Sequence, residues 1–387
     1  MSSARLQISL QPAVLLWARE RVGLDPKELA VKIGIKPDRV SEWETSGKIS
    51  FSQVEKLAHL THTPLGFLYL PEPPDDRLPI PDFRTIGDQT LLRPSPDLLD
   101  TVQAMQRRQG WMRDELIEDG ARPLGFVGSA TLDSKPIEVA EAMRTALRLA
   151  RNWAEAERTW TDALRHLRDR IEEAGVLVVF NGVVGNNTHR KLNPDEFRGF
   201  ALVDAYAPLV FINGADYKAA QMFTMVHELA HIWAGADGVS NFQDMQPSPN
   251  RTERFCNAVA AEFLVPARDL RSAWGQVPQG EAPFNFLARR FKVSSLVAAR
   301  RALDISLIDR DGFFDFYNAY REDERRRRLH DGGGGDFWNN QNVRIGQRFG
   351  AAVVRAVKEG RLLFRDAYLL TGLKGKTFDH FVEAMGI

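Results

Sequence analysis

The sequence contains a single cysteine, Cys256, among 387 residues. One cysteine excludes an internal disulfide and suits a reducing compartment. Long apolar runs are also missing: no stretch approaches the ~18 consecutive apolar residues that a membrane-spanning helix needs. The first residues, Met1 to Arg5, are followed by no apolar segment of signal-peptide length. These absences predict a cytoplasmic protein with no membrane partner.

An excess of charge of either sign is missing as well. Lys and Arg number 51, and so do Asp and Glu, so the whole chain has no electrostatic bias towards nucleic acid or anionic membrane. The hydrophobic share of 44% and the charged share of 26% are ordinary for a globular protein. The length allows two or three domains, each with its own core.

The most informative stretch is residues 223–233, which read Phe-Thr-Met-Val-His-Glu-Leu-Ala-His-Ile-Trp. On a helix, His227 and His231 lie on one face and can bind one metal ion. Glu228 lies one step round the helix, where its carboxylate can reach a metal-bound water. This is the zincin arrangement, in which one more protein ligand completes the site. The alternative is a chance pattern on an ordinary core helix, but the apolar neighbours suit a buried catalytic helix.

The third ligand has to come from elsewhere in the chain. The remaining histidines are scattered, so carboxylates are the better candidates. After a polar loop predicted over 237–250, residues 252–265 are predicted to form a second helix that Pro266 ends. Glu253 and Glu262 lie nine positions apart on it and so about 180° apart round the axis. Only one of them can face the metal, and spacing alone does not choose between them.

The two motifs together resemble a known family. Phe-Thr-x-x-His-Glu-Leu-x-His followed by Glu-x-x-x-Asn-x-x-Ala-x-x-Phe-Leu-x-Pro is similar to the ImmA/IrrE metallopeptidases, over roughly residues 170–310. The resemblance implies Zn²⁺, with Mn²⁺ possible, held by His227, His231 and Glu253, with Glu228 as the catalytic base. It also implies a narrow regulatory target, a repressor- or antitoxin-like protein. The family usually has Ala where this chain has Cys256.

The first 70 residues predict a bundle of four or five short helices, over 12–22, 26–34, 37–45 and 52–60. Asp25 and Pro26 are a helix N-cap and first-turn proline. The pattern resembles the XRE (Cro/repressor-like) helix-turn-helix family, which implies binding to double-stranded DNA. Lys36, Arg39 and Lys48 are the expected contacts.

The charge of this region leaves a second interpretation open. Between residues 11 and 70, eight Lys and Arg oppose seven Asp and Glu, a net charge of only +1. This is a weak electrostatic footprint for DNA binding. A module for protein interaction, or for forming a homodimer, is therefore the alternative.

The rest of the chain predicts a proline-rich linker from Pro71 to Pro81 and long helices over 97–118 and 135–174. Strands are expected over 175–180, 199–204 and 209–213, the last two as a hairpin through Ala207 and Pro208. An edge of this sheet could pair with an extended substrate, or the sheet could be purely structural. Helices over 283–291 and 295–303 resemble a second helix-turn-helix pair, and the remainder is predicted to be helical.

The sequence thus predicts an α+β fold that is mostly α. The expected domains are a helix-turn-helix domain (1–72), a linker and helical segment (73–170), a zincin-like domain with a small sheet (171–282) and a helical C-terminal region (283–387). The predicted function is an intracellular zinc endopeptidase coupled to DNA binding. The alternative is a DNA-binding regulator or antitoxin whose peptidase-like domain senses a partner without cleaving it. Tyr206, Tyr217 and His189 are candidates to stabilise the oxyanion.

Overall fold

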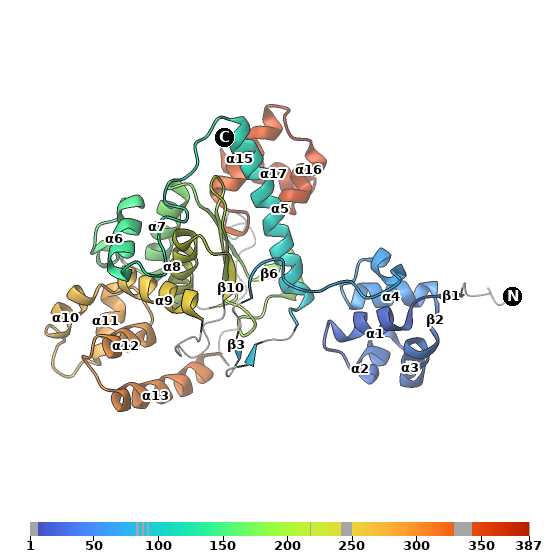
Figure 1. Cartoon of the computed structure of the whole chain (residues 1–387), viewed down its shortest axis with the longest axis horizontal. Coiled ribbons are helices and arrows are strands. Elements are labelled where there is room, and N and C mark those ends of the chain that lie inside the picture. The colour runs from blue at the N-terminus through green and yellow to red at the C-terminus, as the bar shows by residue number, and fades with distance from the viewer. Residues whose placement is uncertain are drawn as a thin grey trace. The chain divides into compact units, whose positions relative to one another are not determined.

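The computed structural model describes residues 7–82, 85–86, 89–90, 93–216, 218–240, 250–328 and 343–386, with the backbone alone for 85–86, 89–90 and 323–328. It divides into two compact units, Met1–Pro79 with Leu91–Asp100 and Ile80–Thr90 with Thr101–Ile387. Helices dominate both units and the sheets are small (Figure 1), which confirms the α+β, mostly α prediction. The domain borders expected near residues 72, 170 and 282 stay predictions.

The N-terminal unit is a small helical bundle with its own apolar core, which includes Leu29, Val40 and Trp43. Asp25 and Glu28 form a reciprocal capping box at the start of its second helix, and Gly34 ends that helix at φ 83°. A two-stranded sheet that the sequence did not predict pairs Ile8 with Ile49. The elements are β1 (Gln7–Ser9), α1 (Pro12–Glu20), α2 (Pro26–Ile33), α3 (Pro37–Ser46), β2 (Lys48–Ser50), α4 (Phe51–Leu60) and the 3₁₀ helix η1 (Leu65–Tyr69).

The second unit begins with two short paired strands and contains the predicted zincin-like region. In its first half the elements are β3 (Thr85–Ile86), β4 (Gln89–Thr90), α5 (Pro96–Glu118, whose first residues belong to the other unit), α6 (Pro136–Ala146), η2 (Trp153–Ala156), α7 (Trp160–Glu173), β5 (Leu177–Asn181), β6 (Val183–Val184) and β7 (Asn187–Lys191). The elements that follow are β8 (Gly199–Leu202), β9 (Leu209–Asn213), α8 (Lys218–Ala234), β10 (Gly238–Ser240) and α9 (Arg251–Leu264).

The main sheet has four strands in the order β10-β8-β9-β5. β8 and β9 pair antiparallel, which confirms the predicted hairpin, while β5 pairs parallel to β9. The prediction of a loop over the whole of 237–250 was wrong at its start, because residues 238–240 form β10 and pair antiparallel with β8. Three residues are too few to show a strand period in the sequence, although Val239 is fully buried.

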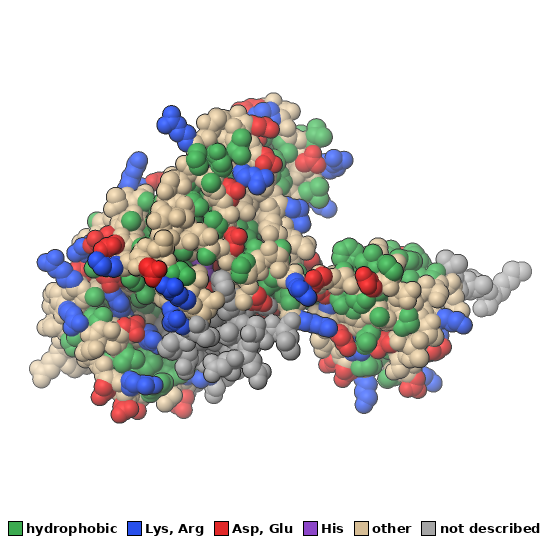
Figure 2. Space-filling view, in the orientation of Figure 1, with side chains coloured by type: hydrophobic (Ala, Val, Ile, Leu, Met, Phe, Trp, Pro, Cys, Tyr) green, Lys and Arg blue, Asp and Glu red, His purple; other side chains and the backbone are tan. Residues whose placement is uncertain are grey.

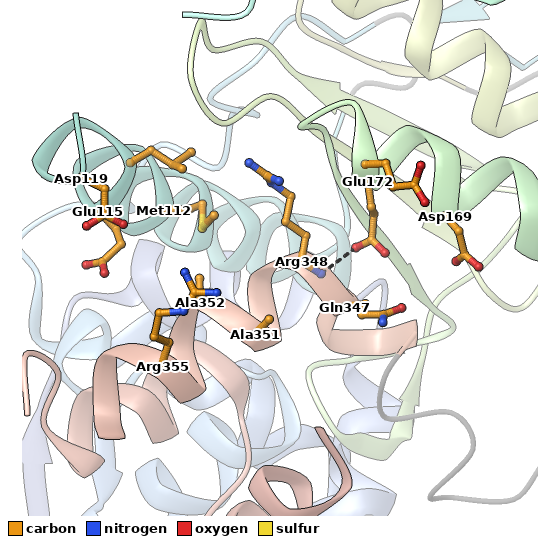
Figure 3. A pocket seen from close by; sticks show the side chains of 12 residues that line it. Met112, Glu115, Asp119, Asp169, Glu172, Gln347, Arg348, Ala351, Ala352 and Arg355 are labelled. Atoms are coloured by element: carbon orange, nitrogen blue, oxygen red, sulfur yellow. Dashed lines mark hydrogen bonds between the residues drawn. The ribbon is translucent and has the colours of Figure 1, made fainter. Parts of the chain in front are cut away.

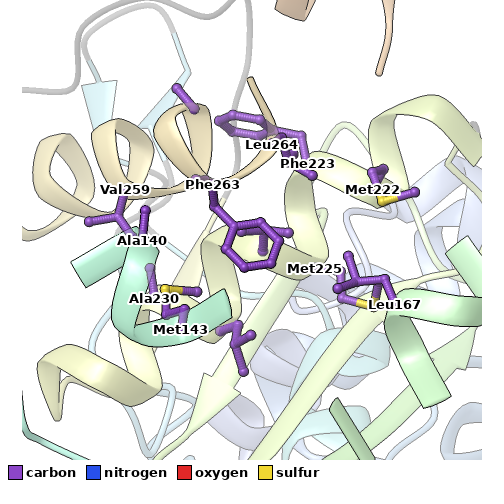
Figure 4. Packing of buried hydrophobic residues seen from close by; sticks show 14 of the residues in the cluster. Ala140, Met143, Leu167, Met222, Phe223, Met225, Ala230, Val259, Phe263 and Leu264 are labelled. Carbon is purple, nitrogen blue, oxygen red and sulfur yellow. The ribbon is translucent and has the colours of Figure 1, made fainter. Parts of the chain in front are cut away.

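Helices α8 and α9 pack together, and α8 also lies on β8 and β9. Figure 4 shows the apolar contacts that hold them, with Phe263 of α9, Met225 of α8 and Met143 of α6 directed towards one another. All three side chains are at most 1% exposed. This packing fixes α9 against the helix that carries the His-Glu-x-x-His residues.

The prediction of one helix over 135–174 was wrong. Helix α6 ends at Ala146. Arg148, two residues later, has a φ of 51°, which is not helical, and the 3₁₀ helix η2 follows. A new helix, α7, starts at Trp160 because the Thr159 hydroxyl accepts a hydrogen bond from the backbone N–H of Asp162. The apolar periodicity continues across this break, so the pattern alone does not show it.

Among the helices that follow α9, two confirm the predicted helices over 283–291 and 295–303. Buried Arg108 of α5 donates hydrogen bonds to the backbone oxygens of Arg344, Leu370 and Thr371, which attaches the C-terminal helices to the second unit. The helices are α10 (Ala267–Trp274), α11 (Pro283–Phe291), α12 (Ser295–Asp304), α13 (Arg310–Arg328), α15 (Gln347–Lys358), α16 (Phe364–Thr371) and α17 (Lys376–Met385). Within the described residues, no helix has both the length and the apolar character required to cross a membrane.

Candidate metal centre

Helix α8 carries the His-Glu-x-x-His residues in its buried middle. His227, Glu228 and His231 are all 0% exposed. The start of the helix is held by the Gln221 side-chain amide, which donates to the backbone oxygen of Asp216 at 2.6 Å. Gly235 follows the last turn with a φ of 66°, a conformation that favours glycine. The helix is therefore fixed at both ends around three buried polar side chains.

The two imidazoles and one carboxylate converge on a single point. The Nε2 atoms of His227 and His231 are 3.0 Å apart. Glu253, on α9 and 3% exposed, places its carboxylate oxygens 3.3 Å from His227 Nε2 and 3.0 Å from His231 Nε2. The ligand atoms of these three residues all lie within 4.8 Å of one another. Two nitrogens and one carboxylate oxygen form the donor set that Zn²⁺ prefers in catalytic sites.

The other ring nitrogens show which atoms carry the protons. Nδ1 of His231 lies 3.1 Å from the backbone oxygen of Ala236, which can only accept, so this Nδ1 carries the hydrogen. Nδ1 of His227 lies 3.0 Å from Oδ1 of Asn257 in the same way. In its neutral form, each imidazole directs the lone pair of Nε2 towards the other ring and towards Glu253. Lone pairs and a carboxylate that face one another repel, and a metal ion between them would remove this repulsion, so the site fits a bound metal ion.

Glu228 lies beside this group, in the buried middle of the same helix. Both carboxylate oxygens are buried, and neither has a hydrogen-bond partner in the part of the chain that the structure describes. Burial raises the pKa of Glu228 to about 8, although His231 and the hydroxyl of Ser240 favour the charged form. Ser240 is thus close to Glu228 but outside hydrogen-bonding geometry. A buried carboxylate without a partner is costly, and a water at the site would give it one.

The structure places the two candidate carboxylates of α9 in different surroundings. Burial alone would raise the pKa of Glu253, but His227 and His231 hold it below its ordinary value. Glu262 instead forms an ion pair with Arg301 of α12. The spacing left both open, and only Glu253 approaches the imidazoles. Cys256 is also buried, which raises the pKa of its thiol, and it interacts with His231 without joining the three converging ligands.

Three further residues shape the site, and none was singled out in the sequence. Ser240 of β10 places its hydroxyl 3.4 Å from Glu253 Oε1 and 3.5 Å from His227 Nε2. Asn257 stands in the second motif, but its contact with His227 depends on the packing of α9 against α8. At Gly199 a Cβ atom would lie 3.0 Å from Cγ of Glu228 and 2.7 Å from Cγ2 of Thr224, so glycine allows α8 to approach β8.

The two described oxyanion candidates, His189 and Tyr206, are not among the residues that contact the converging ligands. His189 is exposed on β7, which pairs with β6 outside the four-stranded sheet. Tyr206 is half-buried in the loop after β8, at the opposite end of that strand from Gly199. Tyr217 lies outside the described residues.

The expected DNA contacts lie on the surface of the N-terminal unit. Lys36 immediately precedes α3, Arg39 lies in its first turn and Lys48 begins β2, and all three are exposed. Nη1 of Arg39 lies 2.5 Å from Oε2 of Glu42. The acid partly neutralises the cation at the helix start that would enter a major groove.

A cavity of about 490 Å³ lies away from the metal centre, between α5, α7 and α15 (Figure 3). Its lining includes Glu172, which accepts a hydrogen bond from the backbone N–H of Arg348 at 3.2 Å. None of the converging ligands lines it.

Two histidines one helical turn apart, a carboxylate from the next helix and a buried glutamate with no hydrogen-bond partner among the described residues have the arrangement of a metallopeptidase-like centre. In agreement, residues 171–303 match the family described as the IrrE N-terminal-like domain (Peptidase_M78). Residues 15–68 match a helix-turn-helix family (HTH_3), and residues 345–384 match a domain of unknown function (DUF8813). No curated protein matches the chain. The chain therefore joins a DNA-binding type of domain to a peptidase-like domain, which confirms the predicted fusion.

Proposed function

We propose that the protein is an intracellular zinc-dependent endopeptidase that regulates gene expression by cleaving a repressor- or antitoxin-like protein. The observation that carries the proposal is the convergence of His227, His231 and Glu253 beside a buried Glu228, whose carboxylate has no hydrogen-bond partner among the described residues. The family match over residues 171–303 supports a peptidase-like domain, and the helix-turn-helix match supports a regulatory setting.

His227, His231 and Glu253 would hold Zn²⁺, with Mn²⁺ as the other metal that this donor set accommodates. The metal supplies Lewis acidity, which lowers the pKa of a bound water and polarises a substrate carbonyl. Glu228 accepts the proton of the attacking water and returns it to the leaving amine. Its pKa is raised by burial, towards the range in which a carboxylate can accept and release a proton near neutral pH.

The residues around the ligands orient them for this chemistry. Asn257 and the backbone oxygen of Ala236 favour the tautomer in which Nδ1 carries the hydrogen and Nε2 can bind a metal ion. Gly199 lets Glu228 pack close to the sheet. Buried Ser240 places its hydroxyl beside both Glu253 and His227.

The test is cleavage by the protein loaded with zinc. The protein and its Glu228→Gln variant are incubated with lysate of the host, and new protein termini are identified by mass spectrometry. Gln is nearly isosteric but cannot accept the proton, so the rate should fall by about 10²–10⁴. Fragments formed equally by both proteins, or by neither at equal zinc content, would count against the endopeptidase.

A second candidate function is a DNA-binding regulator or antitoxin whose peptidase-like domain binds a partner without cutting it. Lys36 and Arg39 are exposed at the start of α3, where they could contact DNA, although Glu42 partly neutralises Arg39. Leu65, Phe67 and Tyr69 are 38–49% exposed, and hydrophobic side chains gather on the α4 side of the N-terminal unit (Figure 2), which suits a protein interface such as a homodimer.

The two candidates differ in what each variant changes. If proteolysis is the output, Glu228→Gln behaves in the cell like a deletion at normal protein level. If DNA binding alone is the output, Glu228→Gln regulates like the wild type, while Arg39→Ala or loss of Lys36 and Lys48 abolishes regulation.

A further inference from the structure

Strand β10 forms one edge of the main sheet and ends at the candidate metal centre. The strand order is β10-β8-β9-β5, so β8 pairs with one side of β10, and no other strand of this sheet pairs with its outer side. Its last residue, Ser240, contacts Glu253 and His227 through its hydroxyl. An extended polypeptide that paired with the outer side of β10 would therefore lie within a residue or two of the centre.

The backbone groups of β10 alternate between the two sides, as in any strand. The oxygen of Ser240 accepts a hydrogen bond from the backbone N–H of Arg198, so Ser240 faces β8. Val239 faces the outer side, because its N–H donates to the backbone oxygen of Pro81 at 3.0 Å. Residues Asp82 and Val239 form a parallel bridge. The end of the linker thus pairs with the edge through one isolated β-bridge.

The linker also buries a side chain next to this hydrogen bond. Ile80 is 8% exposed, whereas Arg77 and Pro79 just before it are exposed. Residues Ile80–Thr90 belong to the same compact unit as β10. One outward backbone hydrogen bond therefore places Pro81 on the strand edge beside the centre, next to a residue whose side chain is buried in the same unit.

We propose that the outer edge of β10 is a docking site for an extended polypeptide and that the linker segment Ile80–Asp82 is its resident occupant. The assignment of the incoming polypeptide as a substrate rests on the proposed function. The competition between that polypeptide and the linker for the β10 edge does not depend on it. An incoming chain in either direction needs the N–H of Val239, which the linker already uses. The outer edge of β10 becomes available only when the linker dissociates from it. A partner that moves the helix-turn-helix module therefore controls whether another polypeptide can bind there.

The linker is a strong competitor for the β10 edge because it is covalently connected to the unit that contains this edge. A segment joined to its own binding site by a short connection acts at an effective concentration on the order of millimolar. A free peptide at micromolar concentration is therefore excluded from the wild-type edge. It gains access when the linker is weakened at a residue that does not itself form the site.

The experiment measures binding of a fluorescent synthetic peptide with the sequence of residues 77–86 to the full-length protein. The variant Ile80→Asp puts a charge at the buried position and should release the resident linker. We expect it to bind the peptide at least ~10-fold more tightly than the wild type. The control Arg77→Asp introduces the same residue at an exposed position of the same linker and should bind like the wild type.

A second change tests the location of binding. Val239→Pro removes the outward N–H but leaves the pairing of Gly238 and Ser240 with β8, because proline is tolerated on the open side of an edge strand. Ile80→Asp combined with Val239→Pro should lose the gained binding. Ile80→Gly replaces Ile80→Asp if the charged variant does not fold, with the same expectation.

Equal peptide binding by the wild type and both Ile80 variants would show that the linker does not compete with the peptide. Retained binding in the variant that combines Ile80→Asp with Val239→Pro would show that the peptide does not bind at the β10 edge. The measurement is made with Glu228→Gln as background, so cleavage is not involved. Loss of the proposed function therefore leaves this result unchanged, and a negative result here leaves the peptidase proposal standing.

Discussion

Oδ1 of Asn257 lies 3.0 Å from Nδ1 of His227, and this contact across two helices sets the direction of the imidazole lone pair. The contact exists because α9 packs against α8 through residues such as Phe263 and Met225. An oriented second ring nitrogen is a general feature of histidines that bind metal.

Asn257→Leu should therefore weaken zinc binding by about 10–100-fold, because the ring loses the acceptor that fixes its tautomer. Competition with a chelator measures the affinity. Asn257→Asp keeps an acceptor at the same place and should bind zinc at least as tightly as the wild type. Equal losses in both variants would show that Asn257 acts through packing and not through the hydrogen bond.

Gly199→Ala should destabilise the second unit by about 1–3 kcal/mol. The new Cβ atom would lie 2.7 Å from Thr224 Cγ2 and 2.9 Å from the backbone oxygen of Phe211, so α8 must move away from β8. Urea unfolding measures the change. Gly125→Ala is the control, because a Cβ atom there meets nothing within 4 Å. If the two variants are equally stable, Glu228 is not positioned by close packing on Gly199.

The sequence predicted the helix-turn-helix, the hairpin and the helix with the two histidines, because each is determined locally by caps, turns and periodicity. It could not separate Glu253 from Glu262 by spacing, since that choice depends on Arg301, which lies 39 residues beyond Glu262 and pairs with it. The contribution of Ser240 was also hidden, because β10 is stabilised by pairing with β8 and not by its own pattern.

The ion pair between Arg39 and Glu42 gives a prediction for DNA binding. Glu42→Gln frees the guanidinium and removes a negative charge near the phosphates, so affinity for a site selected from genomic fragments should rise. Arg39→Ala should weaken a specific complex by about 1–3 kcal/mol if the side chain contacts a base. Fluorescence anisotropy with the selected duplex measures both. No selected site for the full chain, together with stable dimers, would favour the interaction module.

Glu172 predicts a pH dependence of stability. Burial raises its pKa to about 7, while the backbone N–H of Arg348 and the charge of Arg168 oppose the shift and Asp169 adds to it. A carboxyl whose folded pKa lies above its ordinary value of 4.5 costs stability increasingly as pH rises from 4.5 to 7. Glu172→Gln should therefore stabilise the protein at pH 8.5, by up to about 3 kcal/mol.

The gain should shrink towards zero as the pH approaches 4.5. Urea unfolding at pH 5.5 and pH 8.5 measures it. Glu173→Gln is the matched control, because the neighbouring Glu173 is exposed and should show no such difference. A gain from Glu172→Gln that is the same at both pH values would mean that ionisation of Glu172 is not its cause.

The central claim is that His227, His231 and Glu253 form one metal centre, and the zinc content of purified protein tests it most directly. We expect close to one zinc per chain in the wild type and in Glu228→Gln and Glu262→Gln, whose changed side chains are not ligands. His227→Ala, His231→Ala and Glu253→Ala should each lose the metal, because two remaining ligands leave the site open. Full retention of zinc in both histidine variants, by elemental analysis of folded protein, would contradict the account.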